Sequence, residues 1–401
     1  MLNTLRGVRV LDLTRMLAGP FATMILGDLG AEVIKIERPG VGDDIRGVGP
    51  HFLEGESVYF LSVNRNKRSM ALDLARPEGQ AVLRDLLGRC DVLIENFRYG
   101  VAERLGLDHD ALRAQHPRLI TCGMTAFGRS GPDRALPAFD LTLQARAGVM
   151  GLTGHRDGRP ARCGAPIGDL TGGLYAVIAI AAALYEREKT GRGQCIDLGL
   201  LDCQVSLLTY ALSNQVMAHD PMGPQGSGHA DATPYQSLRA RDGELTVAVF
   251  TDTFWPGFCR AIELPEWADD PLLKGRLYRR QRRPELIAAV EAQLATQPRR
   301  YWLERLYAEG VPAAPVQSLE EVAADPQVRA RGMLNAVEHP TVGPFVAPGN
   351  PLRWMGEGDA RPDRAAPQLG ADTDALLREL LGYSDAQIAA LRRAQAPAES
   401  D

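Results

Sequence analysis

The first half of the chain alternates short strand-like runs with helix-like segments, and this alternation restricts the fold more than any other feature. Apolar strand-like runs occupy residues 8–13 and 31–37, and a helix-like segment starting at Pro20 separates them. The pattern then continues with expected strands at 69–72, 92–95, 118–122 and 194–198, and with expected helices at 77–87, 108–115, 140–150, 170–188 and 202–218. Such alternation predicts an α/β fold in which helices cover a mostly parallel sheet.

The pattern changes after residue 219, which indicates a second domain. Residues 220–228 are rich in glycine and proline and are the expected linker. An Asp242-Gly243 turn between two strand-like runs then predicts a β-hairpin. The expected organisation is a large domain over 1–219, the linker over 220–228, a smaller α+β domain over 229–316, and a return to the large domain over 317–401, with two helices in 372–395.

The charge and the apolar content favour a protein that binds small molecules. The net charge is -5, whereas partners such as nucleic acids and membrane surfaces normally require a basic face. Residues 174–184 form the most apolar segment, and they are too few and too closely flanked by charged side chains to cross a bilayer. We therefore expect no nucleic-acid or membrane partner, and a buried helix at 174–184.

The six cysteines are scattered along the chain without a C-x-x-C pair or a nearby histidine at metal-ligand spacing. No bound metal is expected. The N-terminal residues also show no charged segment followed by an apolar one, which a secretory signal would require. Reduced thiols and a cytoplasmic location are the corresponding expectations.

The stretch GAPIGDLTGG, residues 164–173, places one carboxylate at the start of a long apolar helix. Asp169 is expected at the N-cap, where its side chain would bind free backbone N–H groups. The same geometry suits a nucleophile, because the positive end of the helix would keep the carboxylate ionised and the flanking glycines would let a substrate approach the backbone. Local sequence does not separate the structural cap from the catalytic group.

The first strand, helix and strand suggest a nucleotide-binding unit, but the turn TRMLAGP at 14–20 contains no G-x-G-x-x-G. A dinucleotide site is therefore not expected. Basic residues follow several of the strands: Arg15, Arg38, Arg46, Arg65, Lys67 and Arg68. They could bind a polyanionic phosphate group at the edge of the sheet, or they could simply be solvated.

Several blocks occurring in one order resemble the class III (CaiB/BaiF-type) coenzyme A transferases, whose best-known example is formyl-CoA:oxalate CoA-transferase. The blocks are VLDLTRMLAGPFATMILGDLGAEVIKIERPGVGD (10–43), NRNKRSMALDLARPEG (64–79), DVLIENFRYG (91–100), GAPIGDLTGG (164–173), ALYEREKTGRGQ (183–194), GVPAAPV (310–316) and APQLGADTDALLRELLGYS (366–384). The resemblance covers nearly the whole chain.

This resemblance implies a large Rossmann-like domain, a smaller domain and an interlocked homodimer of two ring-like subunits. It also implies that Asp169 is the catalytic aspartate. The implied coenzyme A contacts are Arg15, Met16, Leu17, Ala18, Arg38, Leu72, Asp73, Ala75, Asn96, Phe97 and Arg104. Asn96 and Phe97, within the sequence ENF, match the most specific part of the family motif.

The implied reaction moves CoA from an acyl-CoA donor to a carboxylic acid acceptor through an aspartyl anhydride and an aspartyl-CoA thioester. This chemistry suits a lone carboxylate, because every intermediate is an acyl exchange between carboxylic acids. The region VFTDTFW, residues 249–255, replaces the glycine-rich loop of formyl-CoA transferase. The acceptor is therefore expected to differ from oxalate, for example another dicarboxylate, and His229 to Tyr235 either contact it or form an ordinary loop.

Two alternatives share the same fold. The α-methylacyl-CoA racemases pair the aspartate with a histidine, but this chain has Phe139 at the matching position, and Thr251 stands near the place of a glutamate that they use. Phenylalanine cannot transfer a proton, so the racemase reaction is disfavoured. A CoA-binding protein without catalysis is disfavoured by the intact sequence around Asp169.

Overall fold

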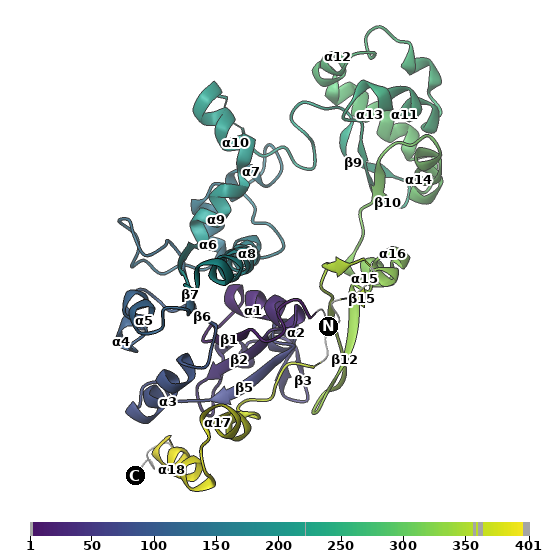
Figure 1. Cartoon of the computed structure of the whole chain (residues 1–401). Helices are drawn as coiled ribbons and strands as arrows, with labels where there is room; N and C mark the ends of the chain where they lie inside the picture. The colour runs from purple at the N-terminus through teal and green to yellow at the C-terminus, as the bar shows by residue number, and fades with distance from the viewer. Residues whose placement is uncertain (1–2, 221, 356–357, 360–363, 396–401) are drawn as a thin grey trace. The chain divides into compact units, whose positions relative to one another are not determined.

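The protein is described by a computed structural model of residues 3–220, 222–355, 358–359 and 364–395 (Figure 1). The chain divides into two compact units. The first comprises Met1–Val149, Cys163–Ser213 and Pro326–Asp401, and the second comprises Met150–Arg162 and Asn214–Asp325. The expected linker at 220–228 thus lies inside the second unit. The domain limits expected at residues 219 and 316 remain predictions.

The first unit is built on a parallel sheet of six strands. They are β1 (Arg9–Asp12), β2 (Glu32–Glu37), β5 (Lys67–Ala71), β6 (Val92–Glu95), β7 (Ile120–Thr125) and β8 (Cys195–Gly199). Their order in the sheet is β5-β2-β1-β6-β7-β8, and every neighbouring pair is parallel. This order is that of a Rossmann-like fold, with a switch point between β1 and β6. The predicted α/β class is confirmed.

Helices cover both faces of this sheet. Alternate strand residues serve the two faces: Val10 packs in the cluster with α1 (Ala18–Asp28) and α8 (Ile167–Thr190), whereas Leu11 packs in the opposite cluster. The opposite face is covered by α3 (Pro77–Leu87), α4 (Val101–Arg104), α5 (His109–Gln115), α17 (Thr373–Leu381) and α18 (Asp385–Gln395). Figure 1 shows α3 and α17 beside β5. The strands β1, β2, β6 and β7 are therefore buried on both sides, as is usual in parallel sheets, whereas the edge strand β8 is only partly buried.

Shorter elements complete the first unit. They are η1 (Asp44–Gly47), β3 (Phe52–Leu53), β4 (Glu56–Ser57), α2 (Val58–Val63), α6 (Asp140–Arg146), α9 (Leu200–Leu207), α10 (Thr209–Ser213), α16 (Pro326–Ala330), β12 (Leu334–His339), β13 (Gly343–Pro348), β14 (Arg353–Trp354) and β15 (Gly358–Asp359). The sequence did not predict α2 or the hairpin of β12 and β13. The helix expected over 140–150 is divided into α6 and α7 (Val149–Leu152).

The second unit has its own core and mixes strands with helices. Its antiparallel sheet has the order β11-β10-β9, formed by β9 (Tyr235–Ala240), β10 (Gly243–Ala248) and β11 (Ala313–Pro315). The helical elements are η2 (Asn214–Ala218), η3 (Asp252–Phe254), α11 (Trp255–Ala261), η4 (Pro265–Ala268), α12 (Arg276–Gln281), α13 (Arg283–Leu294), α14 (Arg299–Ala308) and α15 (Leu319–Ala324). Trp255 and Trp302 are buried at its centre.

Helix α8 differs from the expectation in two respects. It begins three residues earlier and ends two residues later than the expected 170–188, and it has 24 residues. By length and composition it could span a membrane, a property shared by core helices of soluble proteins. Ala176, Ile180 and Leu184 are buried against the sheet, whereas Ile178 and Tyr185 are 62% and 67% exposed. The helix is thus buried along one face and not all round.

Candidate functional site

Asp169 lies in the first turn of α8, but it is not the N-cap. That position is occupied by Pro166, so Asp169 is the third residue of the helix. The capping oxygen comes from another helix, because Asp140 Oδ1 accepts hydrogen bonds from the backbone N–H groups of Gly168 (2.8 Å) and Asp169 (3.3 Å). The predicted N-cap role of Asp169 is therefore wrong, and its carboxylate does not cap its own helix.

The surroundings of Asp169 favour the neutral form of its side chain. Burial and then the negative charge of Asp140 raise the pKa of Asp169 to about 7. Among the described residues, none donates a hydrogen bond to the Asp169 carboxylate. The expectation that the helix end keeps this group ionised is thus wrong, because the N–H groups in question bind Asp140 instead.

Tyr59, on α2, is electrostatically coupled to the same group. Burial and then the charges of Asp169, Asp43 and Asp140 raise the pKa of Tyr59 to about 12. Its hydroxyl therefore stays protonated at neutral pH and can donate a hydrogen bond. Tyr59 also packs in one apolar cluster with Leu170, the residue after Asp169. Tyr59 was not expected from the sequence, because no helix was predicted at α2.

A cavity of about 220 Å³ opens at the carboxyl ends of β1, β2, β5 and β6, where ligands of open α/β sheets bind. Six of the predicted coenzyme A contacts line it: Arg15, Arg38, Leu72, Asp73, Ala75 and Phe97. The guanidinium of Arg15 lies 5.7 Å from the centre of the Phe97 ring. Arg15 and Arg38 both form ion pairs with Asp44. The cavity therefore combines apolar walls with two arginines at its rim.

The other five predicted contacts lie beside this cavity and do not line it. Leu17 and Ala18 are buried at the start of α1, and Arg104 is exposed on α4. Met16 has a positive φ of 69°, and its backbone N–H donates to Asp43 Oδ1 at 3.1 Å. Asn96 binds both backbone groups of Arg15, accepting from its N–H at 2.9 Å and donating to its carbonyl at 2.7 Å.

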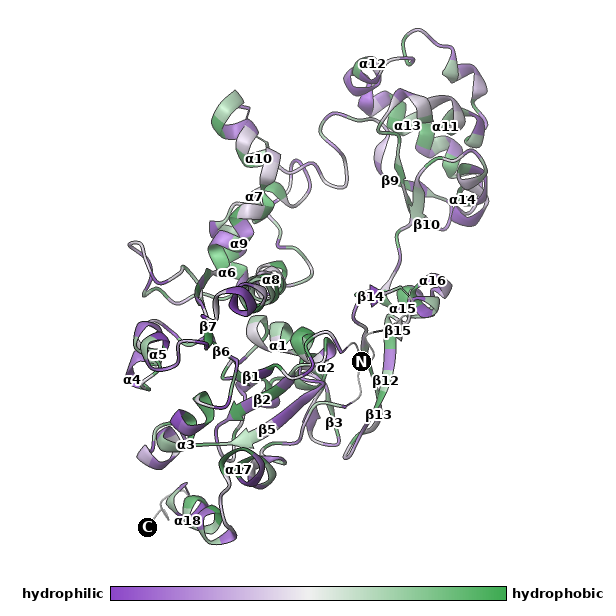
Figure 2. Ribbon diagram, viewed as in Figure 1, coloured by the Kyte–Doolittle hydropathy of each residue, from purple (hydrophilic) through white to green (hydrophobic). Residues whose placement is uncertain are grey.

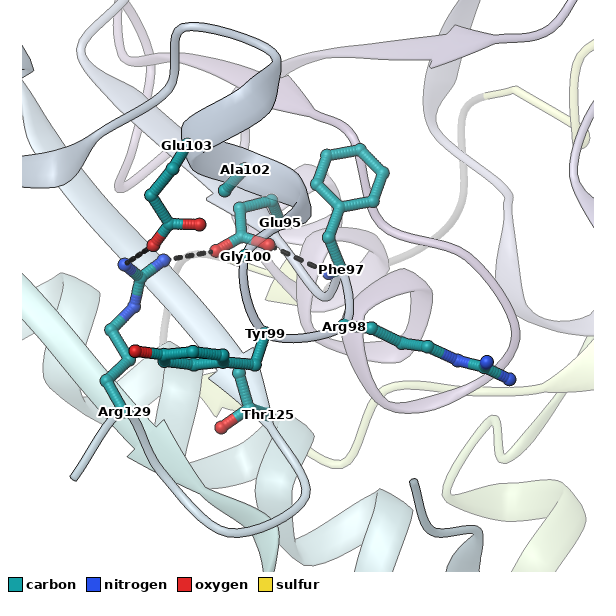
Figure 3. A pocket seen from close by; sticks show the side chains of 9 residues that line it. All are labelled: Glu95, Phe97, Arg98, Tyr99, Gly100, Ala102, Glu103, Thr125 and Arg129. Atoms are coloured by element: carbon teal, nitrogen blue, oxygen red, sulfur yellow. Dashed lines mark hydrogen bonds and ion pairs between the residues drawn. The ribbon is translucent and has the colours of Figure 1, made fainter. Parts of the chain in front are cut away.

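The turn that carries Asn96 and Phe97 is itself held by Glu95, which ends β6. The Glu95 carboxylate accepts from the backbone N–H of Phe97 at 2.8 Å and from the guanidinium of Arg129 at 2.9 Å. Arg129 also bonds to Glu103 on α4 (Figure 3). Glu95 is 1% exposed, so this pairing satisfies a buried charge. Glu95 and Arg129 therefore tie α4 and the ENF turn to the sheet.

A buried charge network lies under the turn at residues 14–16. Lys35 Nζ forms an ion pair with Asp43 Oδ2 at 2.9 Å and donates to the carbonyl of Thr14 at 2.7 Å. Lys67 Nζ pairs with Asp12 Oδ2 at 3.1 Å. Burial opposes ionisation of Asp12, but the positive charges of Lys67 and Lys35 outweigh it and lower the pKa of Asp12 to about 2.

This network explains why β5 is hydrophilic over most of its length (Figure 2). Four members of the predicted basic set are engaged within the protein: Arg46 pairs with Glu37, Arg65 with Asp28, Lys67 with Asp12, and Arg68 with Glu32 and Glu379. These four groups hold the fold together and are not free phosphate ligands. Only Arg15 and Arg38 of that set line the cavity.

His229 belongs to an aromatic cluster of the second unit. Its ring centre lies 5.2 Å from that of Tyr235 and 5.5 Å from that of Phe250. The His229 Nδ1 atom accepts from the backbone N–H of Asp231 at 3.1 Å. A role in binding the acceptor acid stays a prediction.

No group of three or more His, Cys, Asp or Glu side chains within the described part of the chain is arranged to hold a metal ion. The position that distinguishes racemases is visible beside Asp140: Phe139 is 67% exposed and carries no titratable group. Two further groups at the site, Asp43 and Asp140, were not predicted as functional residues from the sequence. Asp140 follows Phe139 directly in the sequence, but only its contact with α8 reveals its role.

Known proteins resemble this chain over almost its whole length. The sequence model of CoA-transferase family III matches residues 5–373. Succinyl-CoA:glutarate CoA-transferase of Mus musculus is 39% identical over 96% of this chain and 88% of its own length. Acetyl-CoA:oxalate CoA-transferase of Acetobacter aceti is 38% identical over 93% of this chain and 95% of its own length.

Solved structures give the same result. A CAIB/BAIF family protein from Brucella suis superimposes with a TM-score of 0.84 and 36% sequence identity, covering 94% of this chain and 99% of that one. This chain therefore belongs to CoA-transferase family III, a family of enzymes that use CoA thioesters as substrates.

Proposed function

We propose that the protein transfers CoA from an acyl-CoA thioester to a dicarboxylic acid, with Asp169 as the nucleophile. The observation that carries this proposal is the state of Asp169: a partly buried carboxylate in the first turn of α8, without a hydrogen-bond donor among the described residues. A carboxylate free of such bonds keeps its nucleophilic lone pairs available. The names of the relatives, which specify glutarate and oxalate, support a dicarboxylic acceptor.

The proposed reaction is a series of acyl exchanges at one carboxylate. Asp169 attacks the carbonyl carbon of the acyl-CoA, and the CoA thiolate leaves, so that a mixed anhydride forms. The thiolate then attacks the aspartyl carbonyl and releases the donor acid, giving an aspartyl-CoA thioester. The acceptor carboxylate attacks the carbonyl carbon of this thioester and expels the CoA thiolate, so that a second anhydride forms. Finally the thiolate attacks the acceptor carbonyl, which releases the new CoA ester and regenerates Asp169.

The cavity at the sheet edge suits the nucleotide end of CoA. Leu72, Ala75 and Phe97 supply apolar walls for the adenine ring, and Arg15 and Arg38 supply positive charge for the phosphates. Asp44, which pairs with both arginines, would give way to the phosphates when the substrate binds. Tyr59 is coupled to Asp169 and is a candidate hydrogen-bond donor to the oxyanion that develops during acyl transfer.

We also propose a homodimer, as the family resemblance implies. Exposed apolar side chains on α8, α9 and α10 support this assembly, since such a surface needs a covering partner. They are Leu174, Tyr175, Ile178, Tyr185, Val205, Leu207, Tyr210 and Leu212. Light scattering of the purified protein would give the mass. A cytoplasmic location is likewise proposed, and cell fractionation would test it.

Incubation with succinyl-CoA and separate dicarboxylic acids, followed by chromatography of the products, tests the proposed function. We expect a new CoA ester with at least one acid of the glutarate size class, and loss of at least about 1,000-fold in rate for Asp169→Ala. Binding of CoA, measured by calorimetry, should persist in this variant because Asp169 does not line the cavity proposed for the nucleotide end of CoA. Full transfer by Asp169→Ala would show that the mechanism is wrong.

A further inference from the structure

The first turn of α8 is held by a carboxylate that belongs to another helix. Asp140 is the first residue of α6 and is 9% exposed. Its Oδ1 atom accepts from the N–H groups of Gly168 and Asp169. The first four N–H groups of a helix have no partner within the helix. Asp140 therefore takes the place that a local N-cap side chain would normally occupy.

Asp140 is itself fixed by a buried glutamine. Its other oxygen, Oδ2, accepts from Gln144 Nε2 at 2.6 Å, and Gln144 Oε1 accepts from the backbone N–H of Cys163 at 2.9 Å. Gln144 is fully buried. A continuous chain of hydrogen bonds thus runs from the segment before α8, through Gln144 and Asp140, to the turn that contains Asp169. Each side chain in it is bound at both ends, which restricts its rotamer.

Gly168 allows a further close contact at this turn. A Cβ atom at position 168 would lie 2.1 Å from Gln204 Nε2 and 2.9 Å from Asp140 Oδ1. Any larger residue would displace both groups. Gln204 is fully buried, and its two polar side-chain atoms have no hydrogen-bond partner among the described residues. The residue before Asp169 is therefore enclosed by α6 and α9.

An acidic residue at the third position of a helix commonly reaches back to the backbone N–H of the N-cap residue. Asp169 has this position, but the N-cap here is Pro166, which has no backbone N–H. The N–H groups of Gly168 and Asp169 are bound to Asp140. Pro166 and Asp140 together thus leave Asp169 without the backbone partners that would immobilise it as a cap.

We infer that Asp140, held by Gln144, is a positioning residue for Asp169: it fixes the first turn of α8 and keeps the nucleophile free to face the thioester. This inference rests on the proposed function of Asp169. Asp140 touches the backbone of Asp169 and is not assigned to the reacting atoms. The competing explanation is that Asp140 stabilises α8 only as a helix cap would.

Three variants separate these explanations. Asp140→Ala removes the positioning group. The double variant Asp140→Asn with Gln144→Glu reverses the buried hydrogen bond: the amide at position 140 donates to the carboxylate at position 144. The amide oxygen at position 140 still accepts from the N–H groups of α8. The negative charge moves from position 140 to position 144, further from Asp169. Asp108→Ala is the matched control, because Asp108 caps α5 by accepting from the N–H of Ala111.

We expect Asp140→Ala to lower kcat by about 100-fold, with KM for the acyl-CoA within about threefold of the wild type. The double variant should recover kcat to within about tenfold. The acid side of its pH profile should move to lower pH, since the carboxylate that raises the pKa of Asp169 is further away. Asp108→Ala should lower the unfolding temperature without moving the pH profile.

Three results would overturn the inference: wild-type kcat in Asp140→Ala, no recovery of kcat by a folded double variant, or an unchanged pH profile in that variant. Mass spectrometry of the wild type after incubation with acyl-CoA separates this from the proposed function. If no CoA adduct forms on the peptide containing Asp169, the proposed nucleophile is wrong. If the adduct forms and the Asp140 variants still behave like the wild type, only the positioning role fails.

Discussion

Two carboxylates of the first unit, Asp12 fully buried and Asp169 partly buried, lie in opposite electrostatic surroundings. Asp12 lies among Lys67, Lys35 and two threonine hydroxyls, and its pKa is lowered to about 2 despite its burial. Asp169 lies beside another carboxylate, and burial together with Asp140 raises its pKa to about 7. Both residues are close to chain segments implicated in CoA binding. The carboxylate of Asp12 has hydrogen-bond and ion-pair partners, whereas that of Asp169 has no hydrogen-bond donor among the described residues.

The difference shows how a buried charge that stabilises the fold can be distinguished from a titratable group that takes part in a reaction. A buried charge with partners contributes to the fold, and removing a partner is costly. A titratable group without such partners, in a site with a shifted pKa, is a candidate for reaction. Burial alone therefore does not distinguish the two carboxylates. The number and the sign of the neighbouring charges do, and on this basis Asp169 is the candidate nucleophile.

Removing a partner in the Asp12 region should have the largest effect. Lys67→Met leaves Asp12 with one cation fewer and frees the acceptors that Lys67 Nζ now binds, the carbonyl of Pro20 and the amide of Asn64. We expect the free energy of unfolding to fall by about 3–5 kcal/mol. Urea denaturation followed by fluorescence would measure it. Arg300→Met, which breaks an exposed pair with Glu304, is the control and should change nothing measurable. Equal stability of the two variants would show that the network is not structural.

The pH dependence of stability should differ in sign between the two carboxylates. Asp169 has a folded pKa above its usual value of 3.8, so the folded state holds a proton that the unfolded state has lost between pH 4 and 7. Its contribution to stability therefore falls as pH rises through that window, by up to about 4 kcal/mol. Asp12 has a folded pKa below 3.8, so its contribution is present above pH 4 and is lost as pH falls toward 2.

Thermal unfolding of the wild type and Asp169→Asn at pH 5 and pH 8 would test this. The variant should gain stability relative to the wild type at pH 8 and gain little at pH 5, because the wild-type side chain is already neutral there. Transfer activity of the wild type should decline as pH falls through about 7, since the nucleophile must be ionised. An identical stability difference at both pH values would contradict the assigned pKa shift.

The smallest effect concerns Asn96, which connects the region of the buried charges to the cavity. Asn96→Ala removes both hydrogen bonds that hold the backbone of Arg15. We expect KM for acyl-CoA to rise about tenfold with kcat nearly unchanged, because the loss concerns binding and not the reacting carboxylate. Steady-state kinetics would measure it, with Asn335→Ala in the β12–β13 hairpin as a control. A fall in kcat alone would show that Asn96 acts on the chemical step.

Much of the first unit could be predicted from the sequence because its elements are encoded locally. Helix α3 occupies Pro77–Leu87 as expected, with the proline at its first turn, and the six parallel strands lie within the expected segments or within two to three residues of them. Helix α2 was missed because VYFLSV is short and contains β-branched and aromatic residues that favour strands. Ser57 caps it by accepting a hydrogen bond from the N–H of Phe60, and packing against η1, β4, β13 and α1 stabilises it.

Some features of the candidate site could likewise be predicted from the sequence, and others depend on the tertiary structure. The sequence by itself determined the family, six of the residues that line the cavity and the presence of Asp169, because these depend on motifs along the chain. It did not determine which side chain caps α8, since Asp140 and Gly168 are distant in sequence and meet only in the folded unit. Nor did it determine the protonation of Asp169, which depends on burial and on the charge of Asp140. Local patterns specify elements and motifs, whereas charge and reactivity depend on neighbours that tertiary structure alone brings together.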